Sequence, residues 1–553
     1  MNRIRQRERS NAADAAGRGV PMRPARTIAT GRLIALAAAV ALVGGLAAGA
    51  GGAMLMNGIS PGSDGIGAGP GGTGAFGGAN TMSYDYTGDY TGTLTADGDS
   101  QSADGKTIEA SDGDTNVILS ENGGTLTVAN ATLNKSGAAS NDDNANFYGT
   151  NSVSLTVGEK STTILDGSEI NATDNGSNGV FVTDSATALV NDIVINTVGD
   201  NSRGLDATYG GTILGNKVTA TTKGDHSATV ATDRGGGNVS IVDSTLNTAG
   251  SGSPLLYSTG DVEVSGVTGT ATGAQIAGME GYNTILIDDS TLESTNTGKT
   301  GSDPIANGVI IYQSTSGDAE SSTGEHATFQ AKDSTLKSAI ESGSMFYFTN
   351  TTADVVLSNT TLDFDTDKAT LINASGNDAN NWGTPGSNGA NVTFTGRSQT
   401  LAGDVTADTI STLNLYLLDG TTWTGAATIG ENASAGAGSG ADSGADSGTD
   451  ATSDAPISVN VDGTSTWVVT RDTTISALNV ASGGKVVDAD GNTVTIIANG
   501  TTVVTGDSDI TVTVTGDYTT TVDAGDETEL AADVIDRSAF DKQFGTSTAW
   551  TMA

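Results

Sequence analysis

A degenerate phrase recurs along the chain: a short stretch in which apolar and polar residues alternate, then Asp or Asn, Ser or Thr, and Thr-Leu. Copies stand at 124–133, 238–246, 283–292, 327–336 and 353–362. Alternation at every second residue is typical of a strand with one buried face, and the spacings of three and four that a helix needs are missing. The pattern therefore predicts repeated β units that bury their apolar faces against their neighbours.

A second series of strands lies between these phrases and begins near residues 179, 203, 227, 253, 308 and 344. Because the two series keep a constant order, we expect every coil to have the same cross-section. The last apolar residue of the turn phrase gives the markers Val194, Val218, Leu246, Val267 and Leu292, with steps of 24, 28, 21 and 25. The next step, to Leu336, is 44 residues and is interpreted as two coils.

A coil of about 20 to 28 residues suits two or three short strands with corners between them. The sequence therefore predicts an all-β fold, a right-handed single-stranded parallel β-helix (β-solenoid) over about residues 84–530. At a strand spacing of roughly 4.8 Å, about 15 coils would stack over roughly 70 Å.

Composition divides the chain into six segments. Residues 1–56 join an Arg-rich head to an Ala/Leu-rich stretch, which is typical of an export signal cleaved near Ala48 or Ala50, or of an uncleaved signal anchor. Residues 57–83 form a Gly-rich tether, and 84–430 the β-helix. Residues 431–456 are an Ala/Gly/Ser/Asp-rich linker or insertion, 457–530 hold further coils or a β cap, and 531–553 are a C-terminal tail. We expect an extracellular or cell-surface location.

Charge and cysteine content exclude several classes of partner. The net charge is −40, and so acidic a surface repels phosphate backbones, which argues against nucleic acid and against anionic lipid. We expect membrane contact only through the N-terminal segment, if it is uncleaved. The chain has no cysteine, which excludes disulfides and thiolate metal sites.

One region concentrates unlike charged groups. Its members are Arg203, Asp206, Lys223, Asp225, His226, Asp233 and Arg234. Aligning Ala207 with Ala231 gives a step of 24, which places these residues on adjacent coils. A lyase could use Arg or Lys as a base and carboxylates to hold calcium against a uronate. The alternative is a set of salt-bridged surface residues, and we expect no catalytic, cofactor or metal site here.

Two weaker candidates remain. The acidic run 442–454 could bind calcium, but it lacks the aspartate spacing of an EF-hand loop, so solvation is expected. An aromatic set has two alternative roles: it lines a sugar-binding face, or it fills the coil interior. This set comprises Tyr209, Tyr257, Tyr312, Phe346, Trp382, Trp423 and Trp467.

Several phrases carry a resemblance to known proteins. RGLDATYGG, ATDRGGG, SPLLYSTGDVEVSGVTGTATG, IIYQSTSGDAE and GNDANNWGTPGSNGANVTF resemble the adhesin-like exported parallel β-helix repeat proteins of gut bacteria, over about residues 84–553. The fold is more distantly similar to the pectin-lyase-like β-helix superfamily. The resemblance implies a binding protein whose partners are glycans or surface proteins of host or neighbouring cells, reached through a repetitive Thr/Ser/Asn/Asp face. The alternative is a polysaccharide-active lyase or glycoside hydrolase, and the oligomeric state stays open.

Overall fold

A computed structural model describes residues 82–314, 326–380, 382–432, 453 and 455–553, all within one compact unit, Ile66–Ala553. The export segment 1–56, most of the tether 57–83 and the acidic run 442–454 apart from Ser453 lie outside the described residues. Among the residues that are described, no helix is long and apolar enough to cross a membrane.

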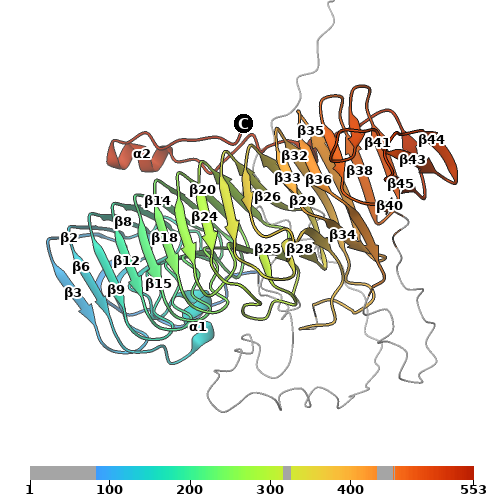
Figure 1. Cartoon of the computed structure of the whole chain (residues 1–553). Coiled ribbons are helices and arrows are strands. Elements are labelled where there is room, and N and C mark those ends of the chain that lie inside the picture. The colour runs from blue at the N-terminus through green and yellow to red at the C-terminus, as the bar shows by residue number, and fades with distance from the viewer. Residues whose placement is uncertain (1–81, 315–325, 381, 433–452, 454) are drawn as a thin grey trace, which may run out of the picture. The chain divides into compact units, whose positions relative to one another are not determined.

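Each coil of the main stack contributes three strands, one to each of three parallel sheets (Figure 1). Sheet A contains β1 (Gly92–Asp97), β4 (Asn116–Glu121), β7 (Ser154–Val157), β10 (Val180–Thr183), β13 (Leu205–Ala207), β16 (Val230–Thr232), β19 (Leu256–Ser258), β22 (Ala277–Glu280), β25 (Asn307–Tyr312), β28 (Ser344–Thr349), β31 (Thr370–Ala374), β34 (Val405–Asp408) and β37 (Ala427–Gly430).

Sheet B is the longest and runs through 15 strands. These are β2 (Ser100–Asp104), β5 (Thr125–Ala129), β8 (Thr162–Asp166), β11 (Thr187–Asn191), β14 (Gly211–Asn216), β17 (Gly237–Val242), β20 (Asp261–Ser265), β23 (Thr284–Asp288), β26 (Ala327–Lys332), β29 (Thr351–Ser358), β32 (Ala390–Arg397), β35 (Thr412–Leu418), β38 (Ile457–Val461), β41 (Ala477–Val480) and β46 (Tyr518–Thr519).

Sheet C completes the coils. It contains β3 (Thr107–Ala110), β6 (Thr132–Lys135), β9 (Glu169–Ala172), β12 (Val194–Thr197), β15 (Thr219–Thr222), β18 (Thr245–Thr248), β21 (Thr268–Ala271), β24 (Thr291–Ser294), β27 (Thr335–Ser338) and β30 (Thr361–Asp363). The predicted parallel β-helix is thus confirmed, with three strands per coil, and the 15 strands of sheet B agree with the predicted number of coils.

Two smaller sheets follow near the C-terminus. Sheet D contains β33 (Thr400–Ala402), β36 (Thr422–Gly425), β39 (Thr466–Val469) and β42 (Lys485–Val487), all parallel. Sheet E contains β40 (Thr473–Ile475), β45 (Thr511–Val514), β43 (Thr495–Ala498) and β44 (Thr501–Val504), of which β43 and β44 are antiparallel. Coils therefore continue beyond Ile457 and end in a small mixed sheet.

The turn between the strands of sheets B and C explains the recurring phrase. Its Asp or Asn adopts the left-handed region, as Asp243 (φ 50°) and Asp289 (φ 44°) do, which these residues tolerate better than most. The following serine bonds to the next coil: the Val267 N–H donates to Ser290 Oγ at 3.0 Å, and the Ser290 N–H to Ser334 Oγ at 3.0 Å. The Leu then points into the core, as the fully buried Leu292 does.

The register corrects the markers. Leu246 pairs with Ala220 and Gly269, so Val218 and Val267 are not its equivalents. The positions of Val218 and Leu246 both face the interior, and the apolar pattern could not tell them apart. Val194 pairs with Thr219 and is 41% exposed, so its use as an equivalent inward marker is wrong. Leu292 pairs directly with Leu336, so the 44-residue interval is one coil and the interpretation as two coils is wrong. Ala207 pairs with Thr232, so the alignment with Ala231 is one residue off.

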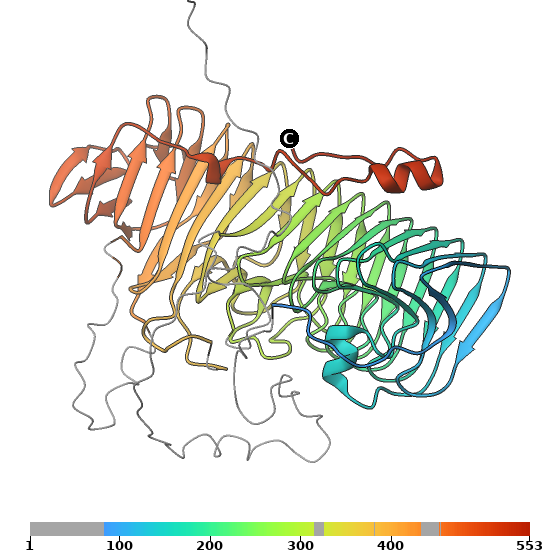
Figure 2. The same ribbon diagram turned by 180° about the vertical axis from the view of Figure 1, so that it is seen from behind.

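The C-terminal residues fold back over the outer face of sheet B. After η1 (Asp526–Thr528), the chain passes β32 and reaches α2 (Ser538–Phe544), where Phe540 packs on Leu189 and Leu214. The chain then returns, and Lys332 Nζ donates to the Ala553 carbonyl at 3.4 Å. We call residues 526–553 the C-terminal strap; Figures 1 and 2 show it in red along one side of the coils.

Candidate functional site

Four of the seven predicted site residues meet on the outer face of sheet A. Leu205 and Ala207 of β13 face the core, so Asp206 between them points outward. The Arg203 guanidinium places Nε 3.5 Å from Asp206 Oδ2 and its terminal nitrogen Nη2 2.7 Å from Asp233 Oδ2. Its other terminal nitrogen donates to Asn146 Oδ1 at 3.0 Å.

This cluster is buried although it lies outside the coil. Asp206 is 0% exposed, and burial raises its pKa to about 7, while the Arg203 charge opposes the rise. The Arg234 guanidinium lies 3.8 Å from the centre of the Phe147 ring, a cation–π contact. The arrangement holds two carboxylates and two guanidinium groups against protein partners.

The other three predicted residues are placed elsewhere. Lys223, Asp225 and His226 lie in the exposed turn between β15 and β16. The Asp225 N–H donates to Asp200 Oδ1 at 2.8 Å, and Asp225 Oδ1 accepts the Ser251 N–H at 2.8 Å. The Asp225 side chain therefore belongs to a ladder that ties successive turns together.

Helix α1 (Asp142–Tyr148) covers the charged cluster through Asn146 and Phe147. The sequence pattern did not predict this helix. Asn141 caps its N-terminus by accepting the Asn144 N–H at 2.9 Å, and Gly149 ends it with φ 71°. Tyr148 at its end stacks on Tyr209 at 5.6 Å between ring centroids. Asn followed by two aspartates is a recognisable helix start and was the available signal.

The aromatic set divides between interior and surface. Trp423 and Trp467 stack 4.8 Å apart in the core, and Phe346 is also a core residue, so these three follow the interior alternative. Tyr312 and Trp382 stack at 4.2 Å on the outer face of sheet A. Near them, the Tyr257 hydroxyl donates to Glu280 Oε2 at 3.1 Å. This outer group is largely buried, with Trp382 6% exposed.

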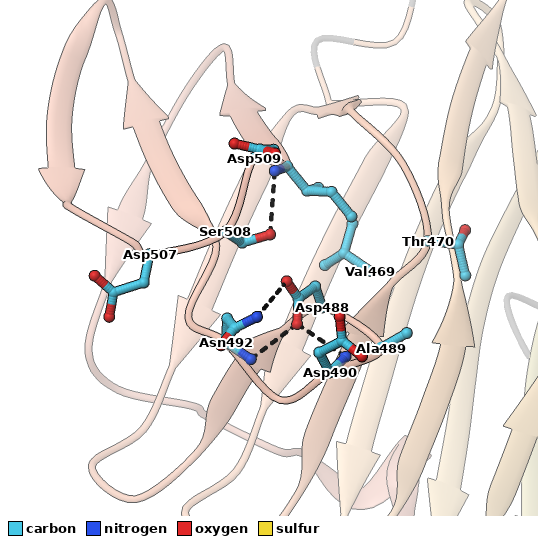
Figure 3. Close-up of a pocket in the computed structure, with 10 residues that line it drawn as sticks. Val469, Thr470, Asp488, Ala489, Asp490, Asn492, Asp507, Ser508 and Asp509 are labelled. Atoms are coloured by element: carbon cyan, nitrogen blue, oxygen red, sulfur yellow. Dashed lines mark hydrogen bonds between the residues drawn. The ribbon is translucent and has the colours of Figure 1, made fainter.

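An acidic depression of about 430 Å³ lies in the C-terminal region (Figure 3). Asp488 accepts the N–H groups of Asp490 and Asn492 at 3.0 and 2.8 Å, and hydrogen bonds from Ser508 and Asn492 lower its pKa. Figure 3 shows the Asp507 carboxylate pointing away from Asp488. In the part of the chain that is described, no group of three acidic or His residues is placed to hold a metal ion.

Sheet C presents a regular outer surface to solvent. We define the sheet C face as the outward residues of β12, β15, β18 and β21 together with the residue that follows each strand. These are Val194, Asn196, Val198, Thr219, Thr221, Lys223, Thr245, Asn247, Ala249, Thr268, Thr270 and Thr272. The first and last of each group of three are exposed and the middle one is half-buried, so the face has a central column between two raised ones.

The outer face of sheet B is not a free surface from β11 to β32, because the C-terminal strap covers it there. Its outward residues Leu189, Leu214 and Leu286 are at most 6% exposed. Polar contacts hold the strap: the Gln330 side chain accepts the Ala531 N–H at 2.7 Å, and Glu263 accepts the Ile535 N–H at 3.0 and 2.8 Å. Apolar residues at outward strand positions were the signal for such a cover.

Comparison with known proteins leaves the family open, since neither a family model nor a curated protein matches the chain.

Proposed function

We propose that the protein is a cell-surface or secreted binding and display protein that attaches to glycans or to surface proteins of host or neighbouring cells. The sheet C face carries the proposal, because it repeats Thr and Asn side chains in register over successive coils. Many similar weak contacts made at once give a higher overall affinity than any one of them.

Export is part of the proposal and rests on the N-terminal composition. The Arg-rich head and apolar stretch in 1–56 would direct the chain out of the cytoplasm, and the Gly-rich tether 57–83 would hold the coils away from the point of attachment.

The alternative, a polysaccharide lyase or hydrolase, depends on the Arg203 region. A general acid or base has to reach the proton that it transfers. Asp206 is 0% exposed beside Arg203, and Arg234 lies against Phe147, so the charged groups contact protein atoms. This geometry supports structural roles for them and favours binding over catalysis.

The experiment measures binding and chemistry together. The purified chain is incubated with pectins and host glycans, with and without calcium, while retention and new unsaturated or reducing ends are followed. Retention without product, unchanged in Arg203→Ala and Arg234→Ala, supports the proposal. Product that disappears in these variants but persists in Arg471→Ala, whose partner Asp404 lies at 2.6 Å on an exposed surface, would overturn it.

A further inference from the structure

In the described residues, the middle strands of sheets A and B are covered on their outer faces, whereas β12, β15, β18 and β21 of sheet C are open. Tyr84 and Tyr90, α1 and Trp382 pack on sheet A, and the strap packs on sheet B from β32 to β11. We propose that the sheet C face is the docking surface for an uncharged, extended polysaccharide. This inference rests on the proposed function and names its site and ligand class.

Charge is the first argument. The chain carries a net charge of −40, yet the sheet C face contains one charged residue, Lys223. Charges resume at its margins, with Glu169 on one side and the Glu293–Lys337 ion pair (2.9 Å) on the other. Covering charged groups without matching partners costs free energy, whereas covering hydroxyl and amide groups costs little when each finds a hydrogen bond. The patch therefore fits a partner without charge.

The chemistry of the face matches a sugar chain. Thr hydroxyls and Asn amides both donate and accept hydrogen bonds, as ring hydroxyls require. Val194, which begins β12, and Val198, which follows it, are 41% and 47% exposed, and Val503 is the other large apolar residue exposed to this extent in the described chain. Sugar rings have apolar C–H faces, and packing them on these valines removes apolar surface from water.

The middle column is ordered at its β12 end, where Asn196 is held in place before any ligand arrives. The Asn196 amide donates to Asn171 Oδ1 at 3.0 Å, and the Asn171 amide to Asn134 Oδ1 at 3.2 Å. Side chains that are already fixed lose less conformational freedom on binding.

Repetition determines the form of the ligand. Successive coils place equivalent residues roughly 4.8 Å apart, so Thr219, Thr245 and Thr268 make a row across the strands. A polymer that follows this row repeats the same contact on each coil, whereas a short sugar reaches one or two. Affinity should therefore rise steeply with chain length and change little with salt, since no ion pair is formed.

The test uses the full chain and two double variants with the same change of charge. Thr219→Arg with Thr245→Arg places two bulky side chains on the sheet C face, and Thr501→Arg with Thr502→Arg places them on the exposed strand β44 of sheet E. The probes are galactomannan and mixed-linkage β-glucan as neutral chains, polygalacturonate as an anionic chain, and a basic protein. Circular dichroism checks that both variants keep their β-structure.

We expect the wild type and the β44 variant to bind a neutral chain alike, at low and high salt, and the face variant to lose about tenfold or more in affinity. Neutral chains that bind the face variant as well as wild type would overturn this inference and leave the proposed function standing. A preference for polygalacturonate, or salt-sensitive capture of the basic protein, would overturn it too. If no glycan is retained by the wild type, glycan binding itself fails, and the inference with it.

Discussion

Arg537 holds the C-terminal strap onto the coils. Its side chain is nearly fully buried, at 2% exposed, and donates to the Ser240 carbonyl at 2.7 Å, Ser240 Oγ at 3.0 Å and the Gly215 carbonyl at 2.7 Å. It also donates to Thr548 Oγ1 of the returning strap at 2.9 Å. Burial lowers its pKa to about 10, so the group is charged at neutral pH. We predict that Arg537→Ala opens the strap while leaving the coils folded.

The magnitude follows from these contacts. A hydrogen bond from a charged donor contributes about 1.5–3 kcal/mol, so four such bonds exceed what a surface contact supplies. Part of this is offset, because the variant no longer buries a guanidinium group, which costs several kcal/mol. A net loss of about 2–4 kcal/mol remains, within the range for a broken buried polar network. The open population of the strap should then rise about 30- to 800-fold.

Hydrogen exchange of residues 531–548 and tryptic cleavage after Lys542 measure that population. The Ile535 N–H, which Glu263 accepts in the closed strap, should exchange faster by the same factor, since local opening sets its rate. Arg471→Ala is the control, because Arg471 is 52% exposed and its surface ion pair contributes little. Exchange and cleavage at wild-type rates in Arg537→Ala would show that the strap is not held in this way.

Three further predictions concern the coils. Gly224→Ala should lower the free energy of unfolding by about 1–3 kcal/mol, and with it the melting temperature, because the new Cβ would overlap the Gly199 carbonyl of the preceding coil. The control Gly298→Ala has open space around the new Cβ and should not change stability, so equal effects of the two substitutions would contradict the packing. Burial raises the pKa of Asp303 to about 7, so the native state keeps a proton that the unfolded chain releases near pH 4. The free energy of unfolding should therefore fall by up to about 4 kcal/mol as the pH rises from about 4 to about 7. Asp303→Asn should flatten that fall in melting curves measured at a series of pH values. Trp423→Ala should lower the free energy of unfolding in urea by about 3–5 kcal/mol, since the ring is fully buried, and should leave glycan retention unchanged. Loss of retention in a folded variant would show that Trp423 takes part in binding.

Local patterning predicted the elements that depend on nearest neighbours. Alternation and the Asp/Asn turn located β5, β17, β23, β26 and β29 of sheet B and the sheet C strand that follows each of them. The second series located β10, β13, β16, β19, β25 and β28 of sheet A. It passed over β22, whose sequence AGME lacks a run of large apolar residues. Absolute register was wrong where Val218 and Leu246 looked equivalent, because the positions one and three residues after the left-handed turn residue both face the interior.

The strap and the buried cluster could not be predicted in this way. Phe540 contacts Leu214, and Arg537 contacts Gly215, across more than three hundred residues, and no periodicity connects them. The charged cluster was found by composition, but its burial depends on α1, which brings Asn146 and Phe147 over Arg203 and Arg234. A pattern read along the chain gives the residues that repeat, and a contact that occurs once leaves no such pattern.

The coil between Leu292 and Leu336 shows that the register of the strands does not depend on the length of the segments that connect them. It inserts residues between Ser294 and Asn307 and between Tyr312 and Ala327, and still its strands pair with the neighbouring coils without a shift. Insertions at these corners therefore cost the stack little beyond loop closure, which grows slowly with length. Evolution can vary the corners while the strands stay fixed, and a designer can graft a foreign epitope there at a chosen height along the stack.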